Sequence, residues 1–283
     1  MKVRNPCAPQ FYQGNVQNQI KGFLKGFITP VTASSVVAGV VPHAGWFYSG
    51  GVAAKVYASI AENPPATVIL FGTVHNIAKV RKNSIYPEGV WKTPIGDVEV
   101  DEHVASLLLD AGPGLFDKSF DAHDGEHSLE VQIPFIKHLM PDAKIVPVAV
   151  LPDKQAVEVG SSVSETVKKL HSRTVVVGST DLTHYGELYG FIPAGIGDSA
   201  KEWMERNDRS IIDKVIKLEA ESVVDEARKN HNACGSGALA ATASFARDMG
   251  AEKGTLLEYI TSCDISPDPV FMMAVGYAGL IFN

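Results

Sequence analysis

The fold is decided by residues 36–51, which read VVAGVVPHAGWFYSGG. The β-branched apolar run Val36–Val41 predicts a strand that is buried on both faces. Pro42 ends this strand because proline has no N–H for the hydrogen-bond ladder. Apolar residues at helical spacing then predict a helix over residues 49–61. Ligands of open α/β sheets bind at the carboxyl ends of the strands, so this pattern places His43 where a binding site is expected.

The composition is typical of a globular protein with a sizeable core. The chain has 283 residues, 45% of them hydrophobic, and a net charge of −7. This acidic balance argues against nucleic acid as a partner, because a phosphate-binding face requires an excess of basic side chains. The sequence shows no signal peptide and no apolar run that would span a bilayer, and its three scattered cysteines suit a reducing compartment. We therefore expect a cytoplasmic protein without membrane contact.

Further strand patterns alternate with helical ones along the chain. Buried strands are predicted at residues 67–72 and 174–178, and further strands at residues 145–151, 256–261 and 271–282. The alternation predicts an α/β fold with a mixed, mostly parallel central sheet flanked by helices. No linker is visible, so residues 1–283 are expected to form a single domain. Pro147 predicts an edge position or a bulge for its strand.

Three histidines directly follow predicted strands: His43, His75 and His184. If their strands are neighbours, the three imidazoles converge on one edge of the sheet. A single histidine at a strand end is commonly a hydrogen-bonded structural residue, and three in parallel positions weaken that interpretation. Imidazoles combined with a thiolate or a carboxylate form a transition-metal ligand set, although the wide spacing matches no local ligand motif.

Three further groups could join this edge. Asp181 lies three residues before His184, His127 lies near the start of a predicted helix, and Cys234 lies in a polar turn. Asp181 could instead only orient His184 or hold a turn. Cys234 could equally be a small buried hydrophobe. The residue types indicate chemistry at this edge, and their roles stay open at this point.

The segment that carries His127 is rich in charge. Glu126 and Glu130 flank it, and both could be solvated carboxylates in the first turn of a helix, where the helix dipole favours negative charge. His123 is expected on the surface. The pattern of this segment alone therefore assigns no function to its carboxylates.

Several blocks together resemble the Memo-like family, whose bacterial and archaeal members are named as the B protein of the AmmeMemoRadiSam system. The first block is Pro42-His43-Ala44-Gly45 with Tyr48-Ser49-Gly50. Further blocks match in the same order: Gly72-Thr73-Val74-His75, Glu126-His127-Ser128-Leu129-Glu130, Ser179-Thr180-Asp181-Leu182-Thr183-His184, and Cys234-Gly235. The resemblance covers nearly the whole chain.

This resemblance implies a fold like that of class III extradiol-type non-haem iron dioxygenases, which hold Fe(II) with two histidines and a glutamate. It implies that His43 and His75 are metal ligands and that Cys234 takes the place of the carboxylate. His184 and His127 would match acid–base histidines, with Asp181 beside them. Fe(II) is the metal implied first. Copper or zinc are alternatives, because a thiolate is a softer ligand than a carboxylate.

Three functions compete. The first is a metal-dependent redox enzyme that acts on a small molecule. In it His184, supported by Asp181, would be the general base, and His127 a proton donor or substrate orienter. The second is a non-catalytic protein that binds a metal or docks a protein partner in the same cleft. The third is a thiol hydrolase that uses Cys234, His184 and Asp181 as a triad-like set. The sequence names neither the substrate nor the partner.

Overall fold

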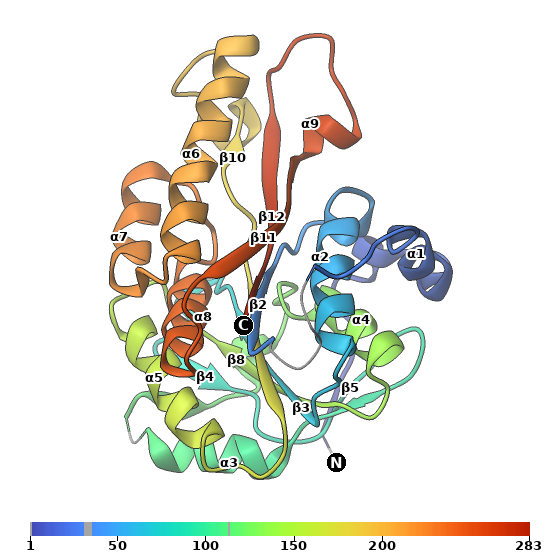
Figure 1. Ribbon diagram of the computed structural model, residues 1–283, viewed down its shortest axis with the longest axis vertical. Helices are drawn as coiled ribbons and strands as arrows, with labels where there is room; N and C mark the ends of the chain where they lie inside the picture. Colours follow the sequence, from blue (N-terminus) through green and yellow to red (C-terminus); the bar gives the residue numbers. More distant parts are fainter. Residues whose placement is uncertain (1, 31–35, 113) are drawn as a thin grey trace.

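The centre of the molecule is a nine-stranded mixed sheet in the computed structural model, which describes residues 2–30, 36–112 and 114–283 (Figure 1). The strands follow the order β10-β12-β2-β9-β3-β8-β4-β7, and β11 pairs with β12. Their bounds are β2 (Ala38–Val41), β3 (Thr67–Gly72), β4 (Asn83–Ile85), β7 (Phe116–Lys118), β8 (Lys144–Ala149), β9 (Thr174–Ser179), β10 (His184–Tyr185), β11 (Gly254–Thr261) and β12 (Ala274–Phe282).

Four parallel strands, β2, β9, β3 and β8, form the middle of this sheet. Their valines and isoleucines are fully buried, as expected for strands that helices cover on both faces. β12 runs antiparallel to β2, and β4 runs antiparallel to β8. The predicted α/β fold with a mixed, mostly parallel sheet is therefore confirmed.

Helices cover both faces of the sheet. On one face lie α1 (Val16–Phe23), α2 (Trp46–Ala61) and α4 (Ile133–Leu139), at the right of Figure 1. On the other lie α5 (Gln155–Val167), α6 (Asp198–Ile216), α7 (Ala220–Asn230) and α8 (Ser236–Asp248), with α3 (Glu102–Ala111) below. Alternate strand residues enter two different cores: Ile69 packs toward α5 and α8, whereas Val68 and Leu70 pack toward α2 and α4.

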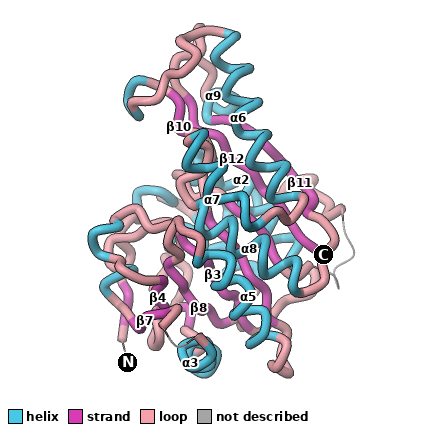
Figure 2. The backbone as a smooth tube through the Cα atoms, turned by 90° about the vertical axis from the view of Figure 1, so that its left-hand side faces the viewer, coloured by secondary structure: helices cyan, strands magenta, loops and turns pink. Residues whose placement is uncertain are grey.

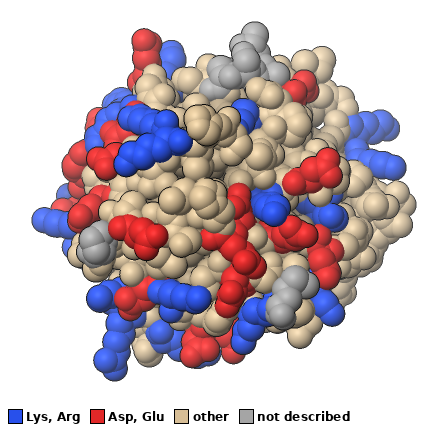
Figure 3. Space-filling model, turned by 90° about the horizontal axis from the view of Figure 1, so that it is seen from below, with Lys and Arg blue, Asp and Glu red and all other residues tan. Residues whose placement is uncertain are grey.

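Smaller elements complete the chain. A three-stranded sheet contains β1 (Val3–Arg4), β5 (Val90–Trp91) and β6 (Val98–Glu99). Short helices are η1 (Pro9–Tyr12), η2 (Ile77–Lys79), η3 (Asp121–His123), η4 (Glu130–Gln132), η5 (Glu187–Tyr189) and α9 (Ser262–Ile265). Figure 2 shows α6 and the ends of β11 and β12 near α9 extending beyond the main sheet. Among the described residues, no helix combines the length and apolar character needed to cross a membrane. Acidic and basic side chains are intermixed on the face in Figure 3.

Three local expectations are wrong. Pro147 lies in an interior strand, opposite Leu70 of β3. Pro147 faces β4, where its carbonyl oxygen accepts a hydrogen bond from the backbone N–H of Tyr86 at 2.9 Å. It has no N–H to return this bond, and the ladder between β8 and β4 ends at Val148. His123 is only 1% exposed, and its Nε2 lies 3.1 Å from the carbonyl oxygen of Ser84. The helix expected to begin near His127 starts as α4 several residues later, after the 3₁₀ turn η4.

A buried carboxyl group on α6 connects the helices to the end of the sheet. Asp208 accepts hydrogen bonds from the backbone N–H of Thr183 at 2.9 Å and from the hydroxyl of Tyr259 at 2.8 Å. Burial raises the pKa of Asp208 from 3.8 to about 7. The folded state therefore keeps a proton that the unfolded state releases across this pH range.

This proton makes stability depend on pH. The contribution of Asp208 is fully present below about pH 4 and is lost as the pH rises to about 7. We expect the free energy of unfolding to fall by up to about 1.4 kcal/mol per pH unit over this range relative to the variant Asp208→Asn. Urea titrations of both proteins from pH 4 to 8 measure the difference. A difference that is constant with pH would contradict the prediction.

Candidate metal centre

His43 emerges from the carboxyl end of β2, in the middle of the sheet. Its side chain is 1% exposed. Its Nδ1 lies 3.0 Å from the hydroxyl oxygen of Ser179 at the end of the neighbouring strand β9. Its Nε2 lies 3.3 Å from the sulfur of Cys234. Burial lowers the pKa of His43, which favours a neutral imidazole with a free lone pair.

His75 follows β3, two strands from β2. Its ring centroid lies 5.2 Å from that of His43. The carboxylate of Glu126 accepts two hydrogen bonds from His75. Oε1 lies 2.9 Å from Nδ1, and Oε2 lies 3.0 Å from the backbone nitrogen. Burial opposes charge on this ring, but Cys234 and Glu126 outweigh it and raise the pKa of His75 to about 10.

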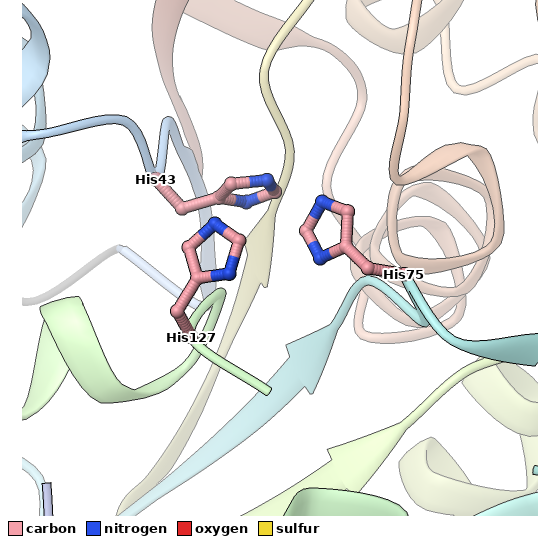
Figure 4. A group of neighbouring side chains, drawn as sticks. All are labelled: His43, His75 and His127. Carbon is pink, nitrogen blue, oxygen red and sulfur yellow. The ribbon is translucent and has the colours of Figure 1, made fainter. Parts of the chain in front are cut away.

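His127 comes from the loop before η4 and joins the other two rings (Figure 4). It stacks on His75 with centroids 4.6 Å apart and meets the His43 ring edge-on at 5.5 Å. One ligand atom from each of the three imidazoles lies within 4.8 Å of the others, so this group could hold a metal ion. The sequence indicated that His127 could join His43 and His75 at this edge, and the family resemblance implied an acid–base role for it, not that of a metal ligand.

Cys234 approaches from the turn that precedes α8. Its sulfur lies 3.3 Å from His43 Nε2 and accepts a hydrogen bond from the backbone N–H of Asp181 at 3.3 Å. Burial raises the pKa of this thiol, but the neighbouring imidazoles of His43 and His75 outweigh it and lower the value to about 6. A thiolate beside imidazoles is a donor set that suits Fe(II), copper or zinc.

Comparisons with known proteins agree on the family. A model of the family described as "Memo-like protein" matches residues 4–281. The chain belongs to the Memo-like family. A "MEMO1 family protein" of Methanosarcina acetivorans is 36% identical over 287 residues, and one of Thermococcus onnurineus is 33% identical over 297 residues. Each alignment covers 99% of both chains.

A solved structure shares the fold of this Memo-like chain. It is the crystal structure of an uncharacterized protein from Escherichia coli K12, which superposes with a TM-score of 0.56. The superposition covers 88% of this chain and 100% of the other, at 13% sequence identity. This similarity supports the mixed α/β architecture and carries no information about the reaction.

The other two expected site residues of the Memo-like chain make different contacts. Asp181 Oδ1 accepts hydrogen bonds from the backbone N–H groups of His43 at 2.7 Å and Ala44 at 3.3 Å. His184 Nδ1 instead lies 3.0 Å from the carbonyl of Leu182, and its ring packs edge-on against Tyr189. Asp181 therefore holds the turn after β2, and the histidine beside Cys234 is His43. These contacts do not assemble the triad of Cys234, His184 and Asp181.

The N-terminal segment of this Memo-like protein is tied to the site by a buried ion pair that the sequence did not indicate. Glu130 is 2% exposed and lies 2.8 Å from Arg4 Nη1. It also accepts from Cys7 N, Ala8 N and Tyr12 Oη, at 2.7 to 2.8 Å. Arg4 Nη2 donates to the carbonyl oxygen of Glu126 at 2.7 Å. Glu126 and Glu130 are therefore buried structural carboxylates, not the solvated groups of a first helical turn.

Proposed function

We propose that this protein binds one transition-metal ion through His43, His75 and Cys234 and uses it in redox chemistry on a small molecule. The observation that carries the proposal is the buried contact of 3.3 Å between His43 Nε2 and the sulfur of Cys234. His75 and His127 form a compact group with His43. An imidazole nitrogen and a sulfur that face each other without an intervening group suit joint coordination of a cation.

Fe(II) is the metal that the family resemblance implies first, and the thiolate of Cys234 makes copper or zinc the alternatives. The depressed pKa of Cys234 makes the thiolate available at neutral pH. Glu126 offers His75 the carboxylate partner that ligand histidines usually have. When bound, iron or copper would supply a redox-active Lewis acid at the carboxyl ends of the strands, whereas zinc would supply a Lewis acid alone.

The remaining side chains provide proton transfer and orientation. Burial, and then the charge of His75, lower the pKa of His127. We assign His127 the role of proton donor or substrate orienter, which its ring N–H can fill. His184 is half-buried at the start of β10, where its ring rests on Tyr189. We assign His184 the role of general base. Asp181 fixes the backbone of His43.

Metal stoichiometry tests the proposal. The protein is loaded anaerobically with Fe(II), Cu(I) or Zn(II), dialysed, and assayed for bound metal. We expect one tightly held ion per chain in the wild type. His43→Ala and Cys234→Ser should each weaken binding by about 100-fold or more, since loss of an outer-shell partner alone costs about 10–100-fold.

Two controls make the assignment specific. Cys263→Ser removes a partly exposed cysteine of α9 and should leave metal binding unchanged. His127→Ala should retain the ion. If His127→Ala lost as much metal affinity as His43→Ala while Cys234→Ser bound the metal normally, the third ligand would be His127 and not Cys234. A wild type that binds none of the three metals would overturn the proposal.

A further inference from the structure

The hydroxyl of Ser179 determines which nitrogen of His43 carries the proton. Ser179 Oγ lies 2.8 Å from the carbonyl oxygen of Ser128, which can only accept, so the single hydroxyl proton is used there. Toward His43 Nδ1, at 3.0 Å, Ser179 must therefore act as the acceptor. The same oxygen also lies 3.3 Å from the amide donor Nε2 of Gln132. His43 thus carries its proton on Nδ1, and Nε2 keeps the lone pair that faces Cys234.

Glu126 imposes the same arrangement on His75. Its two carboxylate oxygens accept hydrogen bonds from the backbone N–H groups of His75 at 3.0 Å and Ser128 at 2.8 Å. Oε1 also lies 2.9 Å from His75 Nδ1. A carboxylate that accepts these hydrogen bonds is ionised and has no proton to donate. Nδ1 of His75 must therefore be the donor and carry the proton. With Nδ1 held by Glu126, Nε2 is the ring nitrogen that remains for the metal, and a bound ion replaces the proton that Nε2 carries in the metal-free imidazolium.

We propose that Glu126 and Ser179 are the positioning residues of the metal centre: they fix His75 and His43 with the proton on Nδ1 and so select Nε2 as the ligating atom of both rings. This inference rests on the proposed metal-binding function and adds how the ligands are oriented. Ser128 joins the two residues, because its N–H donates to Glu126 and its carbonyl oxygen accepts from Ser179. One short loop thereby orients both rings.

The two positioning residues differ in charge. A carboxylate partner raises the basicity of a ligand imidazole, whereas a hydroxyl partner mainly fixes its orientation. Glu126→Gln keeps an acceptor oxygen but removes the charge, and we expect it to weaken Zn(II) binding by about 10–100-fold. Ser179→Ala should weaken it less and should act on His43 alone.

Nitrogen NMR of the full chain, labelled with ¹⁵N-histidine and loaded with Zn(II), tests the proposal directly. Long-range ¹H–¹⁵N correlations show which ring nitrogen carries a proton and which binds the metal, and the signals lost in His43→Gln and His75→Gln assign the two rings. We expect protonated Nδ1 and metal-bound Nε2 in both. Ser179→Ala should accelerate exchange of the Nδ1 proton of His43 only, and Glu126→Gln that of His75 only. Ser164→Ala, a buried serine in α5, is the matched control and should change neither.

The outcomes separate this inference from the proposed function. Metal content after loading reports whether an ion binds at all, and a wild type that holds none of Zn(II), Fe(II) and Cu(I) overturns both proposals. Zinc bound through Nδ1 of either ring overturns the positioning proposal and leaves the metal-binding function intact. Equal exchange rates in the wild type and in both variants also overturn it. The wild-type spectrum decides the protonated nitrogen even where a variant fails to fold.

Discussion

Replacing Glu130 with alanine is expected to lower the free energy of unfolding by about 3–5 kcal/mol, as measured by urea denaturation at pH 7. The carboxylate is buried and is the anion paired with Arg4, whose side chain is 8% exposed. Without it, a buried guanidinium loses its counter-ion. Three further donors, Cys7 N, Ala8 N and Tyr12 Oη, lose their acceptor as well. Each unpaired group adds its own desolvation cost.

The control for this prediction is Glu258→Ala. Glu258 pairs with Lys55 at 2.6 Å, but both side chains are about a quarter exposed. Solvent screens such a pair, so its loss should cost less than about 1 kcal/mol. Equal destabilisation in the two variants would show that burial does not distinguish the pairs. Since Arg4 also binds the carbonyl oxygen of Glu126, we expect Glu130→Ala to weaken metal binding too.

Replacing Asp181 with alanine should remove the acceptor that holds the turn after β2. The backbone N–H groups of His43 and Ala44 would be left unpaired in the interior, at a cost of about 1–3 kcal/mol each. We expect a loss of stability of about 2–6 kcal/mol, together with loss of metal binding because His43 shifts.

Asp181→Asn separates this structural role from an acid–base role. Asparagine keeps the accepting Oδ1 but cannot exchange a proton at neutral pH. We expect stability and metal affinity close to those of the wild type, measured by urea denaturation and by metal titration. An asparagine variant that behaves like the alanine variant would show that the charge of Asp181 is required, not its hydrogen-bonding geometry.

The architecture could be predicted because its signals are local. The run of β-branched residues before Pro42 became β2, and the apolar residues that follow became α2, which begins at Trp46, three residues before the predicted start. Buried parallel strands have continuous apolar sequences, so β3 and β9 were also located correctly. Pro147 was misinterpreted because the position of a strand in the sheet depends on the pairing partners, which the strand's own sequence does not contain.

The site was only partly predictable. The ends of the strands can be predicted from the sequence, and His43 and His75, which follow two of these ends, lie next to each other in the structure. The contacts that orient these rings join residues far apart in the chain, such as Ser179 with His43 and Glu126 with His75. The sequence does not distinguish a buried carboxylate that accepts hydrogen bonds from backbone N–H groups from a carboxylate that is exposed to water. The position of His127 next to His43 and His75 depends on the conformation of a loop, which hydrophobic periodicity in the sequence does not predict.

The placement of β12 has a consequence for synthesis on the ribosome. This last strand lies between β11 and β2, where Leu280 stands opposite Val40. β2 is translated early, yet its two neighbours, β9 and β12, leave the ribosome far later. Such non-local pairing slows folding and leaves an apolar strand unpaired in the nascent chain. We therefore expect β2 to require shielding by chaperones until β12 has left the ribosome, and a message truncated before Leu280 to yield an aggregating product.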